Sequence, residues 1–564
     1  MLKNSLLLFG LLFFTSSYAQ QWNGYFLVAS NSIQNGTSAA LYDTSYNAYH
    51  TWTGLSEKTG YSSYLLPGGT LLRSVKGNNA PSGSPMGPIC GKIQKHDYNG
   101  NLVWDYMVAG TDYVSHHDIQ PMPNGNVLAI VYERKTAAEA TAAGKSSSIA
   151  QMWPDMIMEI QPTGATTGTV VWEWHTWDHL VQNVDNSKAN YKTSIVDNPQ
   201  LININYKPAS DWQHMNGIDY NPILDQIVFS SHNLNEWYVI DHSTTTAEAA
   251  SHSGGNSGKG GDILYRWGNP AAYEATGAAV LNVTHDSHWA DEFSTVPGRI
   301  CGFNNRGVST NQSAADQIIP PVNGYNYTLT TGQAYLPATY DARNTNAGIY
   351  SSNMGGTQQL PNGNELVCEA TAGTIWEFNN TGGIAASHTF TGSLPQCKKY
   401  SACYIINAPP SIPTISLNGT NLVSSTATTY QWYKDGVKIN GATNSTYTPT
   451  ATGIYVVRIT DANGCVHQYS KGYSYVKPNS VSNVIDLSNE IVIYPNPTTG
   501  FVRIKNVYAF GNNFTVNIYD NYGKQILNKK NASSVDLSSF ANGIYSIQII
   551  SEKGIATQKL ILNN

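Results

Sequence analysis

The sequence predicts an all-β protein, and three observations support this prediction. The 564 residues include 36 tyrosines, 13 tryptophans and 49 glycines, a composition that favours short strands joined by tight turns. A Pro-Gly or Asn-Gly turn followed by a short apolar strand recurs at 65–72, 122–130, 296–303 and 360–367. A second strand phrase containing aromatic residues recurs near it, at 100–106, 168–175, 261–268 and 373–378.

The chain begins with features of an export signal. Lys3 precedes an apolar run from Leu6 to Phe14, and Ser17-Tyr18-Ala19 has the small-x-small pattern of a cleavage site. We therefore expect residues 1–19 to be a signal peptide. No later segment approaches the roughly 20 consecutive apolar residues that a spanning helix requires, so no transmembrane segment is expected in the mature protein.

Residues 20–407 are predicted to form a β-propeller. The two phrases repeat at irregular spacings of tens of residues, which is typical of propeller blades with variable insertions. Six blades fit best, while five or seven remain open. Because one blade cannot bury its sheet faces alone, consecutive blades stack around a central channel, where distant residues meet.

The pattern changes after the proline-rich joint at 408–419. Residues 408–476 contain alternating strands with Trp432 as a core residue, which indicates an immunoglobulin-like or PKD-like sandwich. A second joint at 476–484 leads to a small β-sandwich at 485–564. This last segment resembles the type IX secretion C-terminal sorting domain, through Tyr494-Pro495-Asn496-Pro497, Gly500, Gly543-Ile544-Tyr545 and Lys559-Leu560. The resemblance implies that the type IX secretion machinery is a partner, and that the protein passes through the periplasm and outer membrane to be secreted or held at the cell surface.

Charge and cysteine content exclude several classes of function. Only 12% of residues are charged and the net charge is -6, so a nucleic-acid partner is not expected. Cys397 and Cys403 close a short loop that could hold a disulfide, whereas the other pairings stay open. No cysteine belongs to a zinc-binding pattern, and the glycine-rich segment 254–262 lacks the spacing of a phosphate loop, so we expect neither a metal nor a cofactor.

Histidines occur in polar, turn-adjacent clusters of the repeat domain. They are His116-His117-Asp118, His214, His232 and His285-Asp286. Equivalent positions in different blades point to one axis, and an imidazole, with a pKa near 6.5, can supply a neutral nucleophile or a protonated donor. A single histidine near a strand end is more often structural, and we assign that role to His50, His96, His242, His252, His388 and His467.

The same phrases resemble the aryl-sulfate sulfotransferase family, whose members move a sulfuryl group between phenols without a nucleotide donor. The resemblance covers most of residues 24–380, including HHDIQPMPNGN, WEWHTWDHL, DWQHMNGIDYNPILDQIVFSSHN and HDSHWADE. It implies that aryl sulfates and phenols are the substrates and that His285 is transiently sulfurylated. It also assigns His117 and His214 to the sulfate oxygens or to proton exchange with the phenol.

One position departs from the family pattern. His232 follows Ser230-Ser231, where the family has an arginine, so we expect His232 to share the stabilising role and Arg306 or Arg266 to supply the missing cation. Further substrate contacts are expected from Asp118, Asp286, Asn216, Trp289 and Arg306. Asp118 and Asp286 could instead cap the neighbouring backbone, and Trp289 could form an apolar wall for an aromatic ring.

Three functions therefore remain open. The first is sulfuryl transfer, in which neutral His285 attacks the sulfur, the phenolate leaves and a second phenol takes the group. The second is a non-catalytic binding propeller, secreted or at the cell surface in the manner of an adhesin. The third is a metal-dependent propeller enzyme that uses the imidazoles as ligands.

Overall fold

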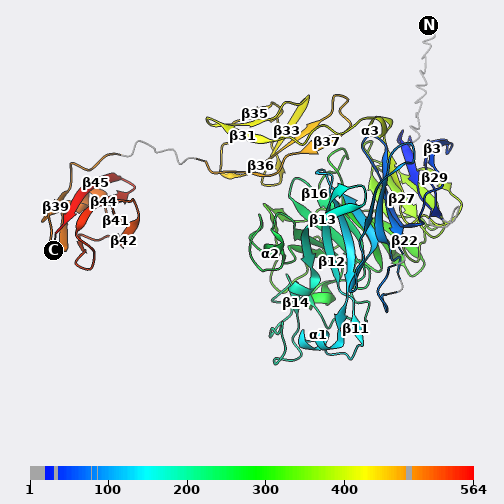
Figure 1. The fold of residues 1–564 in the computed structure, drawn as a ribbon, viewed down its shortest axis with the longest axis horizontal. Helices are drawn as coiled ribbons and strands as arrows, with labels where there is room; N and C mark the ends of the chain where they lie inside the picture. Colours follow the sequence, from blue (N-terminus) through cyan, green and yellow to red (C-terminus); the bar gives the residue numbers. More distant parts are fainter. Residues whose placement is uncertain (1–19, 31–35, 78, 86, 478–484, 564) are drawn as a thin grey trace, which may run out of the picture. The chain divides into compact units, whose positions relative to one another are not determined.

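The computed structural model describes residues 20–30, 36–77, 79–85, 87–477 and 485–563. The predicted signal peptide at 1–19 lies outside the described residues. Strands dominate the described chain, which confirms the all-β prediction. No helix among the described residues is long and apolar enough to cross a membrane. The chain divides into two compact units, 1–476 and 477–564, and Figure 1 colours their elements along the sequence.

The first unit contains a β-propeller made of four-stranded antiparallel sheets that follow one another along the chain. Six such sheets lie among its described residues. The first three are β3(Ala48–Trp52)-β2(Ala39–Tyr42)-β1(Tyr25–Val28)-β30(Lys398–Tyr400), β4(Thr59–Leu66)-β5(Thr70–Lys76)-β6(Gly91–His96)-β7(Leu102–Met107), and β13(Thr167–His175)-β12(Asp155–Gly164)-β9(Val127–Glu133)-β8(Tyr113–Pro121). The other three are β16(Met215–Asn221)-β17(Gln226–Ser231)-β18(Glu236–Asp241)-β19(Tyr265–Trp267), β20(Thr284–Trp289)-β21(Ile300–Ser309)-β22(Gln312–Ile318)-β25(Ala342–Asn344), and β26(Gly356–Gln359)-β27(Glu365–Glu369)-β28(Thr374–Phe378)-β29(Ile384–Thr389).

One edge strand of each sheet faces the same central region. β4 packs against β8, β8 against β16, β16 against β20, β20 against β26, and β26 against β30. β30 pairs antiparallel with β1, which in turn contacts β4, so the end of the propeller closes on its beginning. Residues from both ends of the domain therefore meet at the centre.

The inner strands that carry the histidines are irregular. The pairing of β8 with β9 shifts between Ser115 and Ile119, and that of β20 with β21 shifts between His285 and His288. His117, His214 and Asp286 have positive φ values of 49°, 55° and 54°. A bulge redirects side chains, and a left-handed conformation is strained for a non-glycine residue, so surrounding contacts must hold these segments.

Apolar side chains fill the spaces between neighbouring sheets. Between the third and fourth sheets, for example, Leu128, Trp174, Ile218, Ile227 and Phe229 are at most 2% exposed and belong to one packed cluster. Burial of such faces on both sides of each sheet drives the radial stacking.

Residues after the propeller form a two-sheet β-sandwich that belongs to the same compact unit. Its sheets contain β31(Ile415–Asn418), β32(Asn421–Ser424) and β35(Thr446–Tyr447), and β34(Val437–Lys438), β33(Thr429–Lys434), β36(Gly453–Thr460), β37(His467–Tyr469) and β38(Tyr473–Tyr475). Trp432 is fully buried in its core, as expected. An immunoglobulin-like topology for this domain stays a prediction.

The predicted disulfide between Cys397 and Cys403 is wrong. Cys403, on α3(Ala402–Ile406), bonds to Cys465 of the sandwich, while Cys397 is a free, buried thiol packed near Cys368 in an apolar cluster. Sequence proximity misled because Cys397 points into the propeller core and Cys403 faces the next domain. Glu292 of the propeller adds contacts to this domain, accepting from Tyr433 Oη at 2.7 Å and pairing with Arg458 at 3.5 Å.

Two antiparallel sheets lie among the residues of the second unit that the structure describes. They are β39(Val492–Tyr494)-β40(Phe501–Lys505)-β43(Ser534–Asp536) and β42(Gln525–Lys530)-β41(Phe514–Tyr519)-β44(Gly543–Ser551)-β45(Gly554–Leu562). Their facing apolar residues, including Val502, Val516, Ile547 and Leu560, form one core.

Candidate active site

Four of the histidines singled out from the sequence lie side by side at the inner strands. Ring centroids are 4.7 Å apart for His117 and His214, 5.1 Å for His214 and His232, and 5.5 Å for His232 and His285. His117 and His285 are each only 2% exposed. Residues separated by up to 168 positions therefore form one row of neighbouring imidazoles, in which His117 and His285 are buried and His214 and His232 are partly buried.

Hydrogen bonds fix the tautomer of His285. Its Nδ1 lies 2.7 Å from Asn305 Oδ1, while Asn305 Nδ2 donates to the carbonyl oxygens of Ser351 and Met354. With both amide hydrogens committed, Asn305 meets His285 as an acceptor, so Nδ1 carries the proton and Nε2 carries the lone pair. Burial, followed by the charge of His232, lowers the pKa of His285. The backbone N–H of Met354 donates to Nε2 at 3.1 Å.

His117 belongs to a hydrogen-bonded chain that the sequence did not reveal. Its Nδ1 lies 2.8 Å from His116 Nδ1, and His116 Nε2 lies 2.8 Å from Asp155 Oδ1. When Asp155 is ionised, the donors run toward it and His117 Nε2 is an acceptor; when Asp155 is protonated, the chain reverses and His117 Nε2 is a donor. Burial lowers the pKa of both histidines and raises that of Asp155, which favours a neutral chain.

His214 is paired with a carboxylate. Its Nδ1 lies 2.7 Å from Asp211 Oδ2 and 2.9 Å from Tyr132 Oη. Although burial opposes ionisation of Asp211, the hydrogen bond and charge of His214 lower its pKa. Asp211 therefore orients the ring and holds its carboxylate where it would pair with a protonated His214.

His232 does not replace the family arginine as a permanent charge. Burial, then the charge of His214, lowers its pKa to about 4, so the ring is neutral near pH 7. Arg306 is exposed, yet its charge is one of the causes that lower the pKa of His232, so this cation lies within electrostatic range. Arg266 is fully buried and pairs with Glu236, with Nε 2.9 Å from Oε1, so Arg266 is committed elsewhere.

Two other residues expected at the site have structural contacts instead. Asn216 is fully buried and joins neighbouring inner strands, donating to the carbonyl of Thr284 at 2.7 Å and accepting from Ser230 Oγ at 2.6 Å. Trp289 packs in the apolar cluster that contains Trp237 and Ile300, and does not join the four histidines. The indole ring of Trp289 therefore contributes to packing between sheets.

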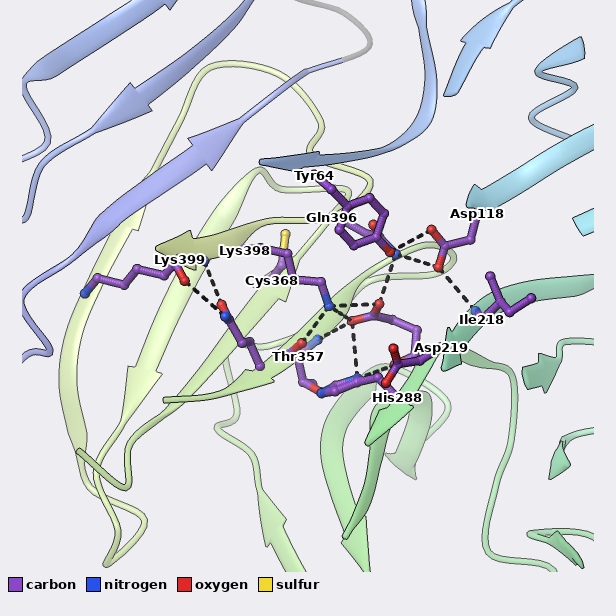
Figure 2. A network of polar contacts seen from close by, with 12 residues as sticks. Tyr64, Asp118, Ile218, Asp219, His288, Thr357, Cys368, Gln396, Lys398 and Lys399 are labelled. Carbon is purple, nitrogen blue, oxygen red and sulfur yellow. Dashed lines mark hydrogen bonds and ion pairs between the residues drawn. The ribbon is translucent and has the colours of Figure 1, made fainter. Parts of the chain in front are cut away.

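Asp118 and Asp286 enter a buried network that contains Gln396 and Lys398. Figure 2 shows Gln396 and Lys398 reaching from the end of the propeller domain toward Asp118, Asp219 and His288. The carboxylate of Asp286 accepts from Lys398 Nζ at 2.9 Å and from Gln396 Nε2 at 2.9 Å. Sequence reasoning missed Gln396 and Lys398 because they lie in no histidine phrase.

The segment before β6 also covers the histidines. A Cβ at Gly87 would lie 3.3 Å from His214 Cε1 and 3.5 Å from His117 Cε1, and the carbonyl of Pro88 accepts from the His117 N–H at 3.1 Å. A side chain at position 87 would therefore crowd the site. A separate cavity of about 570 Å³ is lined by Trp267, Tyr273 and Tyr335, and none of the four histidines lines it.

One histidine group away from the row has the arrangement of metal ligands. His179, His252 and Asp262 place three ligand atoms within 4.8 Å of one another. His179 Nδ1 and His252 Nδ1 lie 2.9 and 2.7 Å from Asp262 Oδ1, distances typical of hydrogen bonds. Within the described ranges, the four histidines of the row form no such group.

These features define a β-propeller with a buried histidine site and a separate C-terminal β-sandwich. Residues 83–392 match the arylsulfotransferase (ASST) family, and residues 492–563 match the secretion system C-terminal sorting domain. The first match covers more than half of the chain, so this protein belongs to the arylsulfotransferase family. The second confirms the predicted sorting domain and supports export to the cell surface or beyond.

Comparison with curated proteins gave no match. Among solved structures, a putative 6-phosphogluconolactonase from Bacteroides fragilis is 9% identical, covers 69% of this chain and 99% of its own, and has a TM-score of 0.34. A nidogen/laminin complex is 8% identical, with coverage of 66% and 97% and a TM-score of 0.32. A β-propeller domain from Myceliophteria thermophila is 9% identical, with coverage of 69% and 86% and a TM-score of 0.29. These low scores carry no functional argument.

Proposed function

We propose that this protein transfers a sulfuryl group from an aryl sulfate to a phenolic acceptor through a sulfurylated His285. Family membership supports sulfotransferase activity in general. The observation that carries the specific proposal is the contact between His285 Nδ1 and Asn305 Oδ1, which leaves the lone pair on Nε2 of a neutral ring. A neutral imidazole is a competent nucleophile, whereas a protonated one is not.

The first half-reaction forms one bond and breaks one. The Nε2 lone pair attacks the sulfur, the bond between sulfur and the aryl oxygen breaks with its electron pair, and a phenolate leaves. The sulfuryl group takes the place of the Met354 N–H that occupies Nε2 in this structure. Negative charge on the three sulfuryl oxygens then requires inward-pointing donors.

In this proposal, neighbouring residues serve those oxygens. His214, whose Nδ1 is paired with Asp211, contacts these oxygens, and exposed Arg306 adds a fixed charge near His232. His232 contributes a neutral contact at pH 7 because of its low pKa. This division of roles compensates for the histidine that stands in place of the family arginine.

The second half-reaction returns the site to its starting state. The oxygen of an incoming phenol attacks the sulfur, the bond between sulfur and Nε2 breaks, and the electron pair returns to His285. His117 Nε2 accepts the phenolic proton when the chain through His116 ends on ionised Asp155. The reverse arrangement donates a proton to the departing phenolate, so one chain serves both half-reactions.

Turnover tests the proposal directly. With 4-nitrophenyl sulfate and phenol, wild-type protein should release nitrophenol with ping-pong kinetics, and His285→Asn should lose at least about 10³-fold in kcat. His252→Asn is the control, because the side chain of His252 is 63% exposed and does not belong to the histidine row. Equal turnover by wild type and His285→Asn would refute the nucleophile.

A non-catalytic binding propeller, secreted or at the cell surface, is the second candidate. Two observations favour it: Met354 N–H caps Nε2 of His285, and neutral His232 stands in place of an arginine. This candidate predicts that aryl sulfates bind reversibly without release of phenol. We further propose that residues 1–19 direct passage into the periplasm before the sorting domain engages the type IX machinery.

A further inference from the structure

The residues that follow His117 and His285 share one buried network. Gln396 Nε2 donates to Asp286 Oδ1 at 2.9 Å and to Asp118 Oδ2 at 3.2 Å. Lys398 Nζ lies 3.1 and 2.9 Å from the two oxygens of Asp286, and also donates to the carbonyl of Thr357 at 3.0 Å. Gln396 thus bridges the two carboxylates that adjoin the two histidines.

Other strands complete the hold on both carboxylates. Asp118 accepts from Tyr64 Oη at 2.9 Å and from the Ile218 N–H at 3.3 Å, which come from β4 and β16. Asp286 accepts from the Thr357 N–H of β26 at 2.8 Å. Strands from four sheets, including the one closed by β30, therefore fix these two side chains (Figure 2).

The network also braces strained backbone. Asp286 has a φ of 54°, and its backbone is so close to β16 that a Cβ at Gly217 would lie 2.7 Å from Asp286 Cα. His117, beside Asp118, has a φ of 49°. Such conformations persist only when surrounding contacts over-determine them. The orientation of both imidazoles therefore depends on the anchoring of the adjacent carboxylates.

Charge in this network is unbalanced without Lys398. The buried carboxylates of Asp118 and Asp286 and the partly buried carboxylate of Asp219 all act on this ammonium group. Burial raises the pKa of Asp118 and of Asp219 to about 7. Although burial opposes its charge, Lys398 has a raised pKa because of Asp286. Lys398 therefore stays charged at neutral pH beside Asp286, while Asp118 and Asp219 are partly protonated.

We propose that Lys398 and Gln396 are positioning residues for the histidine site. Gln396, just before the strand β30 that closes the propeller, and Lys398, at the start of that strand, aim His117 and His285, and Lys398 also neutralises the carboxylate beside the nucleophile. An aryl sulfate is an anion, so an unpaired buried carboxylate next to His285 opposes both its binding and the sulfuryl transfer. This inference rests on the proposed function and extends it to residues more than 100 positions from His285.

The chain offers a matched control in the next residue. Lys399 is also buried in an ion pair, with Nζ 2.8 Å from Glu377 Oε2, and it packs against Phe26 away from the aspartates. Lys398→Met and Lys399→Met each remove one buried ammonium from the same strand. A loss that reflects stability alone affects both variants, whereas a positioning role distinguishes them.

The experiment measures kcat, KM for 4-nitrophenyl sulfate and thermal unfolding for both variants, for Lys398→Arg and for Lys398→Met combined with Asp286→Asn. We expect Lys398→Met to lose about 100-fold in kcat/KM and Lys399→Met less than about 3-fold at a temperature where both are folded. Lys398→Arg should recover to within about 10-fold, and the double variant should recover KM because it removes both charges. Equal kinetic constants for folded Lys398→Met and Lys399→Met, or a double variant no better in KM than Lys398→Met, would overturn the inference.

Failure of the proposed function gives a different result. If wild type binds 4-nitrophenyl sulfate without releasing nitrophenol, the proposed sulfuryl transfer is wrong. The inference about Lys398 is then tested by measuring the affinity of each variant for this anion by calorimetry. Weaker binding by Lys398→Met than by Lys399→Met then supports it, and equal binding overturns it. If wild type does not bind this anion, both proposals are overturned.

Discussion

Asn305 Oδ1 lies 2.7 Å from His285 Nδ1, and Asn305 donates its two amide hydrogens to the carbonyls of Ser351 and Met354. One side chain thus connects the tautomer of the proposed nucleophile to two backbone positions in the segment before β26. The geometry selects an amide over a carboxylate at position 305, because a carboxylate would face both carbonyls as an acceptor.

Asn305→Asp should therefore impair transfer in a specific way. The new carboxylate favours doubly protonated His285, which has no lone pair, and repels two carbonyl oxygens. We expect kcat to fall about 10- to 100-fold and unfolding free energy to fall by about 1–3 kcal/mol. Kinetics and urea denaturation measure the two effects. Asn304→Asp, whose side chain bonds to Val280 and Asp316, is the control, and an unchanged kcat for Asn305→Asp would contradict the tautomer assignment.

His232→Arg should strengthen binding of the aryl sulfate donor. The native ring is neutral at pH 7, whereas a guanidinium keeps its charge and can bind two sulfate oxygens at once. A hydrogen bond to a charged group contributes about 1.5–3 kcal/mol, so KM for an aryl sulfate should fall about 10-fold or more. His252→Arg adds the same charge on an exposed loop. A KM that is unchanged or higher only in His232→Arg would show that His232 does not face the donor.

The pH profile should be displaced toward acid. Burial, followed by the charge of His232, lowers the pKa of His285, so its nucleophilic neutral form persists below the ordinary value of about 6.5. The acid limb of kcat/KM, which reports the free enzyme, should therefore have its midpoint below pH 6.5. Rates measured between about pH 4 and pH 9 provide the check. A midpoint at or above 6.5 would mean that the nucleophile is solvated or is another group.

The disulfide should stabilise the junction between propeller and sandwich. Cys403 and Cys465 are 62 positions apart, and the chain-entropy model gives about 4 kcal/mol for a loop of that length. Reductant should lower the unfolding midpoint of wild type but leave a Cys403→Ser/Cys465→Ser variant unaffected. An equal effect of reductant on both proteins would show that reduction of the Cys403–Cys465 bond is not what lowers the midpoint.

The histidine row was predictable because each imidazole follows or precedes a repeated turn and strand. His117, His214 and His285 lie on or beside the inner strands β8, β16 and β20, while His232 follows β17 in the same sheet as His214. Radial stacking brings these places together. The repeated turn-and-strand motifs likewise indicated the propeller. The motif Tyr494-Pro495-Asn496-Pro497 and the residues that follow it indicated the sorting domain.

The supporting residues were not predictable for physical reasons. Lys398 and Gln396 reach the centre only because β30 pairs with β1, a closure that no local pattern encodes. Nothing in the sequence distinguishes Asn305 from other asparagines in strands, because its role depends on hydrogen bonds to two distant carbonyl groups. Asn216 and Trp289 lie in promising phrases, but local sequence does not say which side of an inner strand faces the channel. The predicted pairing of Cys403 was wrong because its partner, Cys465, lies in another domain.

In the proposed reaction, His285 Nε2 carries the sulfuryl group from the aryl sulfate to the phenol. Rapid quenching of the protein after addition of 4-nitrophenyl sulfate without acceptor, followed by peptide mass mapping under conditions that preserve acid-labile adducts, tests it most directly. We predict one sulfuryl group on the peptide that contains His285, removed by phenol and absent from His285→Asn. A sulfuryl group on another residue, or none during continuing turnover, would contradict the account.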